Sequence, residues 1–205
     1  MRQSNLNAYG DEIYVLDTET TGLKGIPMDH VVDIAIASAN IETGEVKPIF
    51  QSVVGYDIRY WTESARKAWV FENTDLTLMD VQRAPRVRDV AKQVLDLLKG
   101  HPVTSYNVSF DFGKFLYSRP WDLYDKIILA YDPMKAAAQV CKLPPKFEGA
   151  DYKWPSLQHA YQTICPDDPA GMNGGQDHRA MSDAIMAAYL TVQMYNDGTY
   201  DPAIK

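Results

Sequence analysis

The stretch YVLDTETTGL, residues 14–23, joins a short apolar run to two acidic residues and a polar turn. Side chains alternate along a β-strand, so Asp17 and Glu19 are predicted to project from one face while Thr18 projects from the other. Two carboxylates on one face repel each other unless solvent or a cation screens them. Converging carboxylate oxygens are typical ligands of Mg²⁺ and Mn²⁺. Alone, the pattern also fits a solvated strand end, so other parts of the chain must decide between the two.

The composition is that of an ordinary globular protein. The chain has 205 residues, 46% hydrophobic and 23% charged, with a formal net charge of −7, which is compatible with one compact domain over residues 1–205. An acidic balance argues against a protein that coats nucleic acid by surface charge alone, but not against an enzyme that carries bound metal ions. Cys141 and Cys165 lack zinc-ligand spacing and are expected to be reduced thiols.

Neither the first residues nor the hydropathy predicts a targeting or membrane segment. The opening sequence, MRQSNLNAYGDE, is polar and contains no basic segment followed by an apolar one. No apolar run reaches the length of about 18 residues that a membrane-spanning helix requires. These features predict an intracellular, cytoplasmic protein with no membrane partner.

The periodicity predicts three strands near the start of the chain, followed by a mixture of helices and short strands. The expected strands cover residues 12–17, 30–39, 46–54, 102–107 and 126–132. The expected helices cover residues 85–100, 109–118, 133–141, 155–164 and 178–195, and residues 165–177 are expected to form a loop. Ser109 is predicted to cap its helix, and Pro133 and Pro155 are predicted at first helical positions. This order predicts an α/β fold with a mixed sheet covered by helices.

Asp111 is the second acidic residue of interest, in YNVSFDFGKFL, residues 106–116. In the first turn of a helix, a carboxylate is stabilised by free N–H groups and the helix dipole, which is a sufficient structural reason for its presence. Phe110, Phe112 and Phe115 surround it. Such rings either stack on unpaired bases or simply belong to the core.

The third segment is DHRAMSDA, residues 177–184. Asp183 follows His178 by five residues, which on an ideal helix turns the second side chain by about 140° relative to the first. We therefore expect His178 in the entry turn and Asp183 one turn further along the helix. Asp177, beside His178, is a candidate N-cap of this helix.

Together and in this order, the three segments resemble the motifs of the DEDD exonuclease superfamily, and in particular its DnaQ-like, DEDDh branch. The likeness runs over about residues 12–195, and DTETTGL is its most specific part. The sister branch has tyrosine four residues before the last acid. Here Arg179 occupies that position and His178 stands one residue earlier, which assigns the chain to the histidine branch. Tyr106 departs from the histidine that many relatives have before the asparagine, and this predicts altered contacts to the substrate.

The resemblance implies an RNase H-like fold, a mixed five-stranded β-sheet flanked by α-helices. It also implies a metal-dependent 3′–5′ exonuclease that acts on the 3′ end of single-stranded DNA or RNA and releases nucleoside 5′-monophosphates. Asp17, Glu19 and Asp183 are expected to hold one divalent ion, Mg²⁺ or Mn²⁺. Asp17 is expected to share a second ion with Asp111. His178 is expected to act as the general base on the attacking water.

The resemblance also implies contacts to the end of the substrate. Thr20 is expected at the terminal sugar, and Leu23 either packs on a base or is a simple hydrophobic plug. Phe110 and Tyr106 are further candidates for substrate contacts, while Asn107 either contacts the substrate or caps the next helix.

The sequence also offers candidates for basic residues that contact the substrate and for a protein partner. Arg179, Lys114 and Lys153 are scattered candidates for contacts to the nucleic-acid backbone. A DNA polymerase or a second copy of the chain is a candidate partner.

Two alternatives stay open from the sequence. The first is a catalytically idle nucleic-acid-binding or polymerase-associated module with the same fold, and the second is an unrelated metal-binding phosphatase. Retention of all four acids and the histidine argues against the first, because an idle module has no need of like charges in one place.

Overall fold

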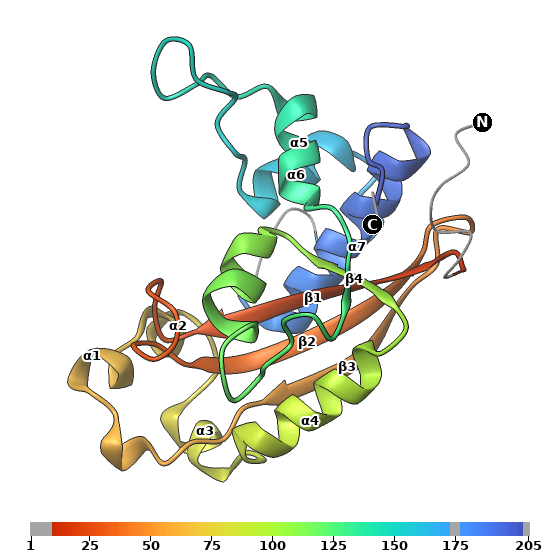
Figure 1. Ribbon diagram of the computed structural model, residues 1–205. Helices are drawn as coiled ribbons and strands as arrows, with labels where there is room; N and C mark the ends of the chain where they lie inside the picture. Colours follow the sequence, from red (N-terminus) through yellow and green to blue (C-terminus); the bar gives the residue numbers. More distant parts are fainter. Residues whose placement is uncertain (1–9, 173–176, 203–205) are drawn as a thin grey trace.

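A single five-stranded sheet lies between two groups of helices in the computed structural model, which describes residues 10–172 and 177–202 (Figure 1). The strands are β1 (Glu12–Thr20), β2 (Val31–Asn40), β3 (Val46–Val53), β4 (Pro102–Ser105) and β5 (Ile128–Leu129), in the order β3-β2-β1-β4-β5. β2 is antiparallel to β1 and β3, whereas β4 is parallel to β1 and to β5. The predicted mixed five-stranded α/β sheet is confirmed. The predicted loop extends into residues 173–176, and the predicted domain into residues 1–9 and 203–205, all outside the described residues.

The larger helices follow the predicted order, with differences at their ends. They are α4 (Val87–Leu98), η3 (Ser109–Leu116), α5 (Pro133–Cys141), α6 (Leu157–Ile164) and α7 (Ala180–Asn196), and η3 is a π-helix. Pro133 begins α5 as predicted. The prediction for Pro155 is wrong, because Ser156 caps α6 and places the proline outside the helix. The prediction for Ser109 is also wrong, since its hydroxyl donates to the Asn107 side chain instead.

The segment between β3 and α4 folds into short helices that the sequence analysis left unassigned. They are η2 (Ile58–Tyr60), α1 (Glu63–Arg66), α2 (Trp69–Asn73) and α3 (Leu78–Arg83). Helices of one turn carry too few residues to show a period, so they depend on tertiary packing rather than on their own pattern. No helix in the described ranges is long and apolar enough to cross a lipid bilayer.

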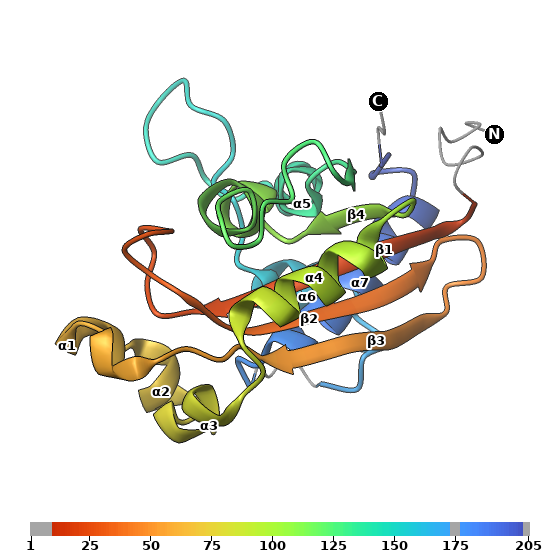
Figure 2. The same ribbon diagram turned by 60° about the horizontal axis from the view of Figure 1, so that its bottom comes forward.

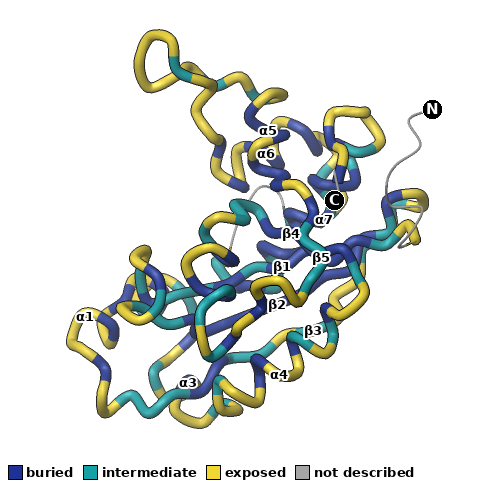
Figure 3. The backbone as a smooth tube through the Cα atoms, in the orientation of Figure 1, coloured by how far each residue is buried: buried dark blue, intermediate teal, exposed yellow. Residues whose placement is uncertain are grey.

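The two faces of the sheet are covered by different helices, as Figure 2 shows. Ile13 and Val15 of β1 pack in one cluster with α5, α6 and α7. Tyr14 and Leu16 pack on the opposite face with α4 and η3, to which η3 contributes two core phenylalanines, Phe112 and Phe115. β1 and β2 are therefore mostly buried, whereas the connection between α5 and α6 is mostly exposed (Figure 3).

Small side chains line the contact between β2 and α7. Ala35 and Ala37 of β2 are fully buried in the same cluster as Ala184 and Ala188 of α7. The distance between packed elements depends on the side chains between them, so alanines on both sides allow a close approach. This close approach brings the short side chain of Asp183 within reach of β1.

Candidate active site

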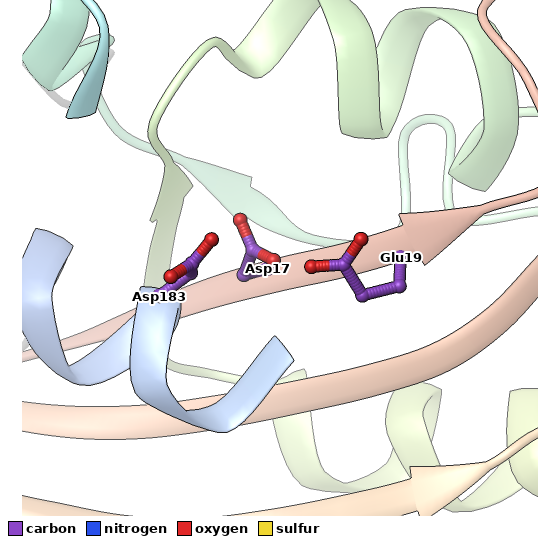
Figure 4. Close-up of side chains that lie close together, drawn as sticks. All are labelled: Asp17, Glu19 and Asp183. Carbon is purple, nitrogen blue, oxygen red and sulfur yellow. The ribbon is translucent and has the colours of Figure 1, made fainter. Parts of the chain in front are cut away.

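Three carboxylates from two elements converge on the face of the sheet that α7 covers (Figure 4). Asp17 and Glu19 project from β1, and Asp183 projects toward them from the first turn of α7. Their carboxylate oxygens lie within 4.8 Å of one another. The strand alternation is as the sequence predicts. Asp183 lies in the first turn and not one turn further along, because α7 begins two residues later than predicted. Tertiary packing brings the two segments together.

Asp111 approaches the same cluster from the opposite face of the sheet. It lies in the first turn of η3, is only 2% exposed, and accepts a hydrogen bond of 2.6 Å from the Thr18 hydroxyl. Thr18 separates the two acids of β1 and projects away from them, so it links Asp111 to the strand. Among the neighbouring charges, Asp111 contributes most to the raised pKa of Asp17. The structure thus brings all four predicted acids to one region.

Burial and mutual repulsion strongly disfavour the charged forms of these acids. Burial raises the pKa of Asp17 well above its usual range, and the charges of Asp111 and Asp183 raise it further. Burial together with Asp183 raises the pKa of Glu19 to about 9. Burial raises the pKa of Asp111 to about 7, although the hydrogen bond from Thr18 lowers it. A set of oxygen donors that repel one another in this way fits a hard divalent cation.

His178 lies two residues before α7, outside the helix and not in its entry turn as the sequence predicts, because α7 begins at Ala180. Its backbone is in the left-handed region, with φ of 54°. Its ring stands edge-on to the ring of Trp69 in α2, with centroids 4.9 Å apart. Trp69 was not identified from the sequence, because an isolated aromatic residue in a one-turn helix shows no periodicity.

Arg179, the next residue, is held by two carboxylates. Its Nε donates to Asp33 at 2.8 Å, and its Nη1 donates to Asp75 at 2.6 Å. Asp33 is fully buried in β2, opposite Glu19 in the strand register. Arg179 is therefore engaged within the protein rather than directed at a substrate, and it ties the start of α7 to the sheet. A charged residue inside an apolar strand needs a partner, and this signal could have identified Asp33.

Three of the predicted substrate residues line one pocket beside the carboxylates. Thr20, Leu23 and Phe110 share this pocket, of about 520 Å³, with Glu19 and Trp69. Leu23 is 73% exposed and Trp69 is 54% exposed. Leu23 is therefore not a buried hydrophobic plug, and both apolar side chains are available to a ligand.

The turn after β1 is fixed from several sides. A Cβ atom at Gly22 would lie 2.5 Å from a carboxylate oxygen of Asp29, so only glycine fits there without a shift. The Thr20 hydroxyl donates to the Gly22 carbonyl at 2.8 Å. Lys114 donates from its ammonium group to the Leu23 carbonyl at 2.6 Å. The pocket wall is thus preorganised.

Tyr106 and Asn107 lie outside the described lining of this pocket. The Tyr106 hydroxyl donates to the Pro155 carbonyl at 3.0 Å. Asn107 has φ of 82°, and its N–H donates to the Asp132 side chain at 3.2 Å. These contacts give both residues a structural role, and their predicted contacts to the substrate stay predictions.

The chain matches the family described as "Exonuclease" over residues 14–191. It belongs to the exonuclease family. It is similar to DNA polymerase III PolC-type of Bacillus cereus, with 26% identity over 191 residues, 91% of this chain and 12% of the relative. The same polymerase of Oceanobacillus iheyensis is 29% identical over 189 residues, 92% of this chain and 12% of the relative. The chain thus spans about an eighth of the length of these relatives.

Solved structures show the same fold at low identity. A full-length 3′-exonuclease aligns with a TM-score of 0.63 and 22% identity, over 93% of this chain and 84% of that chain. The nuclease domain of 3′hExo, a DEDDh family member bound to rAMP, aligns with a TM-score of 0.56 and 21% identity, over 97% of this chain and 98% of that chain. E. coli Exonuclease I in complex with a dA16 oligonucleotide aligns with a TM-score of 0.61 and 16% identity, over 91% of this chain and 41% of that chain. The predicted exonuclease family and the predicted mixed-sheet fold are confirmed, and family membership disfavours an unrelated phosphatase.

The raised pKa values predict how stability depends on pH. The pKa of Glu19 is about 9 in the native protein and 4.5 in an ordinary environment, so between these values the metal-free native state binds more protons than the unfolded chain. The free energy of unfolding in a chelator should therefore fall as pH rises from about 5 to about 8. Mg²⁺ or Mn²⁺ should raise the melting temperature more at the higher pH, because carboxylates bind cations when deprotonated.

Thermal denaturation with chelator or cation checks this dependence. In the Glu19→Gln protein both effects should be smaller. A melting temperature that does not respond to either cation at about pH 8 would contradict the assignment of these carboxylates as a cation site.

The ion pair of Arg179 predicts a stability loss of a definite size. Arg179→Met would leave the buried carboxylate of Asp33 without this partner and should lower the free energy of unfolding by about 3–5 kcal/mol. Asp75→Asn is the matched control, because the Asp75 side chain is 79% exposed and its loss should cost about 0.2–1 kcal/mol. Urea denaturation measures both, and equal losses would show that burial of Asp33 does not matter.

Proposed function

We propose that this domain is a metal-dependent 3′–5′ exonuclease that removes nucleoside 5′-monophosphates from the 3′ end of single-stranded DNA or RNA. The observation that carries the proposal is the cluster of three buried or half-buried carboxylates within 4.8 Å of one another, beside a pocket with exposed apolar walls. Family membership supports the reaction class. The geometry supports an end-binding site because one turn, residues 20–23, borders both the pocket and the carboxylates.

Two divalent cations, Mg²⁺ or Mn²⁺, suit the all-oxygen donor set. Asp17, Glu19 and Asp183 would hold one ion, and Asp111 would complete a second site with Asp17 from the opposite face of the sheet. Bound cations would supply the positive charge that stabilises the developing negative charge on the scissile phosphodiester. They would also relieve the repulsion that raises the pKa values of these acids.

The remaining side chains would position the water and the substrate. His178 would accept a proton from the attacking water at a ring nitrogen, and the edge contact with Trp69 would restrict the rotation of its ring. Arg179 would hold the backbone next to His178 through its pair with Asp33. His178 would therefore carry out the proton transfer, while Trp69 and Arg179 would hold its ring and its backbone in position.

The pocket would take the terminal nucleotide. Leu23 and Trp69 would pack on its base, while Thr20 would contact the sugar and Phe110 would form part of the wall. Of the similar structures, Exonuclease I is in complex with a DNA oligonucleotide and 3′hExo is bound to rAMP. This chain is therefore to be tested with both polymers.

A polymerase is the partner that the comparisons favour. The chain aligns with 12% of each PolC-type polymerase, which suits a domain that acts beside a polymerising domain. Association with a second copy of the chain stays a prediction.

The reaction is tested with a 5′-labelled single strand, DNA and RNA in parallel, with and without Mg²⁺ or Mn²⁺. Metal-dependent shortening from the 3′ end is expected. His178→Ala should lower the rate by about 10²–10⁴-fold through loss of the general base, and Asp17→Ala should abolish shortening. Asp89→Ala, at an exposed position of α4, is the matched control. Binding without metal-dependent shortening would favour the idle module instead, and activity of Asp17→Ala equal to that of the unaltered protein would refute the mechanism.

Replacement of Leu23 and replacement of Trp69, the two exposed apolar residues of the pocket, should affect KM and kcat differently. Leu23→Ala should raise KM for a single strand without a change in kcat, because Leu23 is proposed to contact only the substrate. Trp69→Ala should raise KM by about tenfold, as expected for a lost stacking contact, and should also lower kcat because its ring supports His178. Steady-state kinetics on one labelled oligonucleotide checks both, and an identical pattern for the two variants would argue against the role of Trp69.

A further inference from the structure

A long exposed connection between α5 and α6, residues 142–156, lies outside the site described above. In Figure 1 and in Figure 2 it projects away from the body of the molecule, on the side at which β1 finishes. That end carries the acids and the pocket. The connection therefore lies on the same side of the molecule as the acids and the pocket.

Aromatic side chains gather on this connection without becoming core. Phe147 is 71% exposed, Trp154 is 53% exposed and Tyr152 is 38% exposed. Together with Lys146 and Lys153 they line a concave site of about 370 Å³. Large exposed aromatic residues grouped in this way mark binding surfaces more often than folding contacts.

The shape of the connection is held by its own backbone and by a contact to the domain. Lys153 donates from its backbone N–H to the Leu143 carbonyl at 3.2 Å, which pairs the two arms. The Tyr106 hydroxyl donates to the Pro155 carbonyl at the base of the connection. Tyr106 is five residues before Asp111, so the base is anchored to the segment that carries this acid.

The charge of the connection differs from that of the rest of the chain. Residues 142–154 contain three lysines against Glu148 and Asp151, a net charge of +1, in a chain whose net charge is −7. Neither Lys146 nor Lys153 forms an ion pair with any residue that the structure describes. Free cations interleaved with aromatic rings suit a polyanion whose bases can stack.

We propose that this connection is a second binding surface for the single-stranded nucleic acid, which holds nucleotides on the 5′ side while the 3′ end occupies the pocket. The proposal rests on the proposed function. The rings of Phe147 and Trp154 would stack on bases, and Lys146 and Lys153 would contact phosphates. The surface would raise affinity for long strands without reading their sequence, because every base presents a face to stack on.

Binding is measured with a fluorescent single strand of about 20 nucleotides, DNA and RNA in parallel, in an Asp17→Asn background that prevents cleavage. Phe147→Ala and Trp154→Ala should each weaken binding by about 5- to 100-fold, the range of one lost stacking contact. Lys146→Ala and Lys153→Ala should each reduce the slope of log affinity against log salt by about 0.7. The matched controls are Tyr124→Ala, whose exposed ring contacts Tyr117 of the cluster under α4, and Lys92→Ala, at an exposed position of α4; they should change neither quantity. Unchanged affinity and slope in all four variants of the connection would overturn the proposal and leave another class of partner for these rings.

A small substrate separates this proposal from the proposed function. An aryl ester of a nucleoside 5′-monophosphate occupies the pocket but cannot reach the connection. In the Phe147 and Trp154 variants, kcat/KM for the long strand should fall about 5- to 100-fold relative to kcat/KM for the ester. An equal loss on both substrates would overturn the proposal. Absence of hydrolysis of both the ester and the long strand in the unaltered protein would instead refute the proposed function, while the binding experiment would still decide the role of the connection.

Discussion

The mutual repulsion of carboxylates that the fold forces together is the constraint on which the site depends. Asp17 and Glu19 share a face of β1 because strand side chains alternate, and Asp183 reaches them because alanines let α7 lie close to β2. Burial prevents water from screening these charges, so the pKa values rise. A bound cation would offset this repulsion, and the packing of α7 therefore assembles the carboxylates that we propose to hold it.

The same end of the sheet contains one acid that the protein neutralises by itself. Asp33 lies on β2 opposite Glu19, yet it pairs with Arg179 and so differs from the cluster beside it. This pair holds the start of α7, next to His178, through an interaction that does not compete with the cation ligands. Asp33 thus stabilises this junction, whereas the carboxylates of the neighbouring cluster are the ones that we propose to hold the cation. The charge of Asp33 also raises the pKa values of Asp17 and Glu19, and Arg179 lowers that of Glu19, so loss of the pair would affect the cluster through charge as well as through the position of α7.

Regular elements and connections contribute differently to the activity that we propose. The acids project from a strand and from the first turns of helices, where the backbone fixes their positions. Of the apolar residues that line the pocket, Leu23 comes from the turn after β1 and Trp69 from a one-turn helix, while Phe110 comes from η3. The more distant aromatic surface lies wholly on the connection between α5 and α6. Such a division lets substrate range change through loops while the reactive groups stay in place.

The sequence by itself determined the order of the strands and helices along the chain, the shared face of Asp17 and Glu19, and the first-turn position of Asp111. These follow from period-two and period-3.6 patterns and from motifs, which are local properties of the chain. Only the tertiary structure decided that Trp69 supports His178 and that Arg179 pairs with Asp33, 146 residues away. The one-turn helices between β3 and α4 were also decided there, because so few residues carry no period. Contacts between distant segments depend on how layers pack, and packing leaves no periodic trace in the residues that it joins.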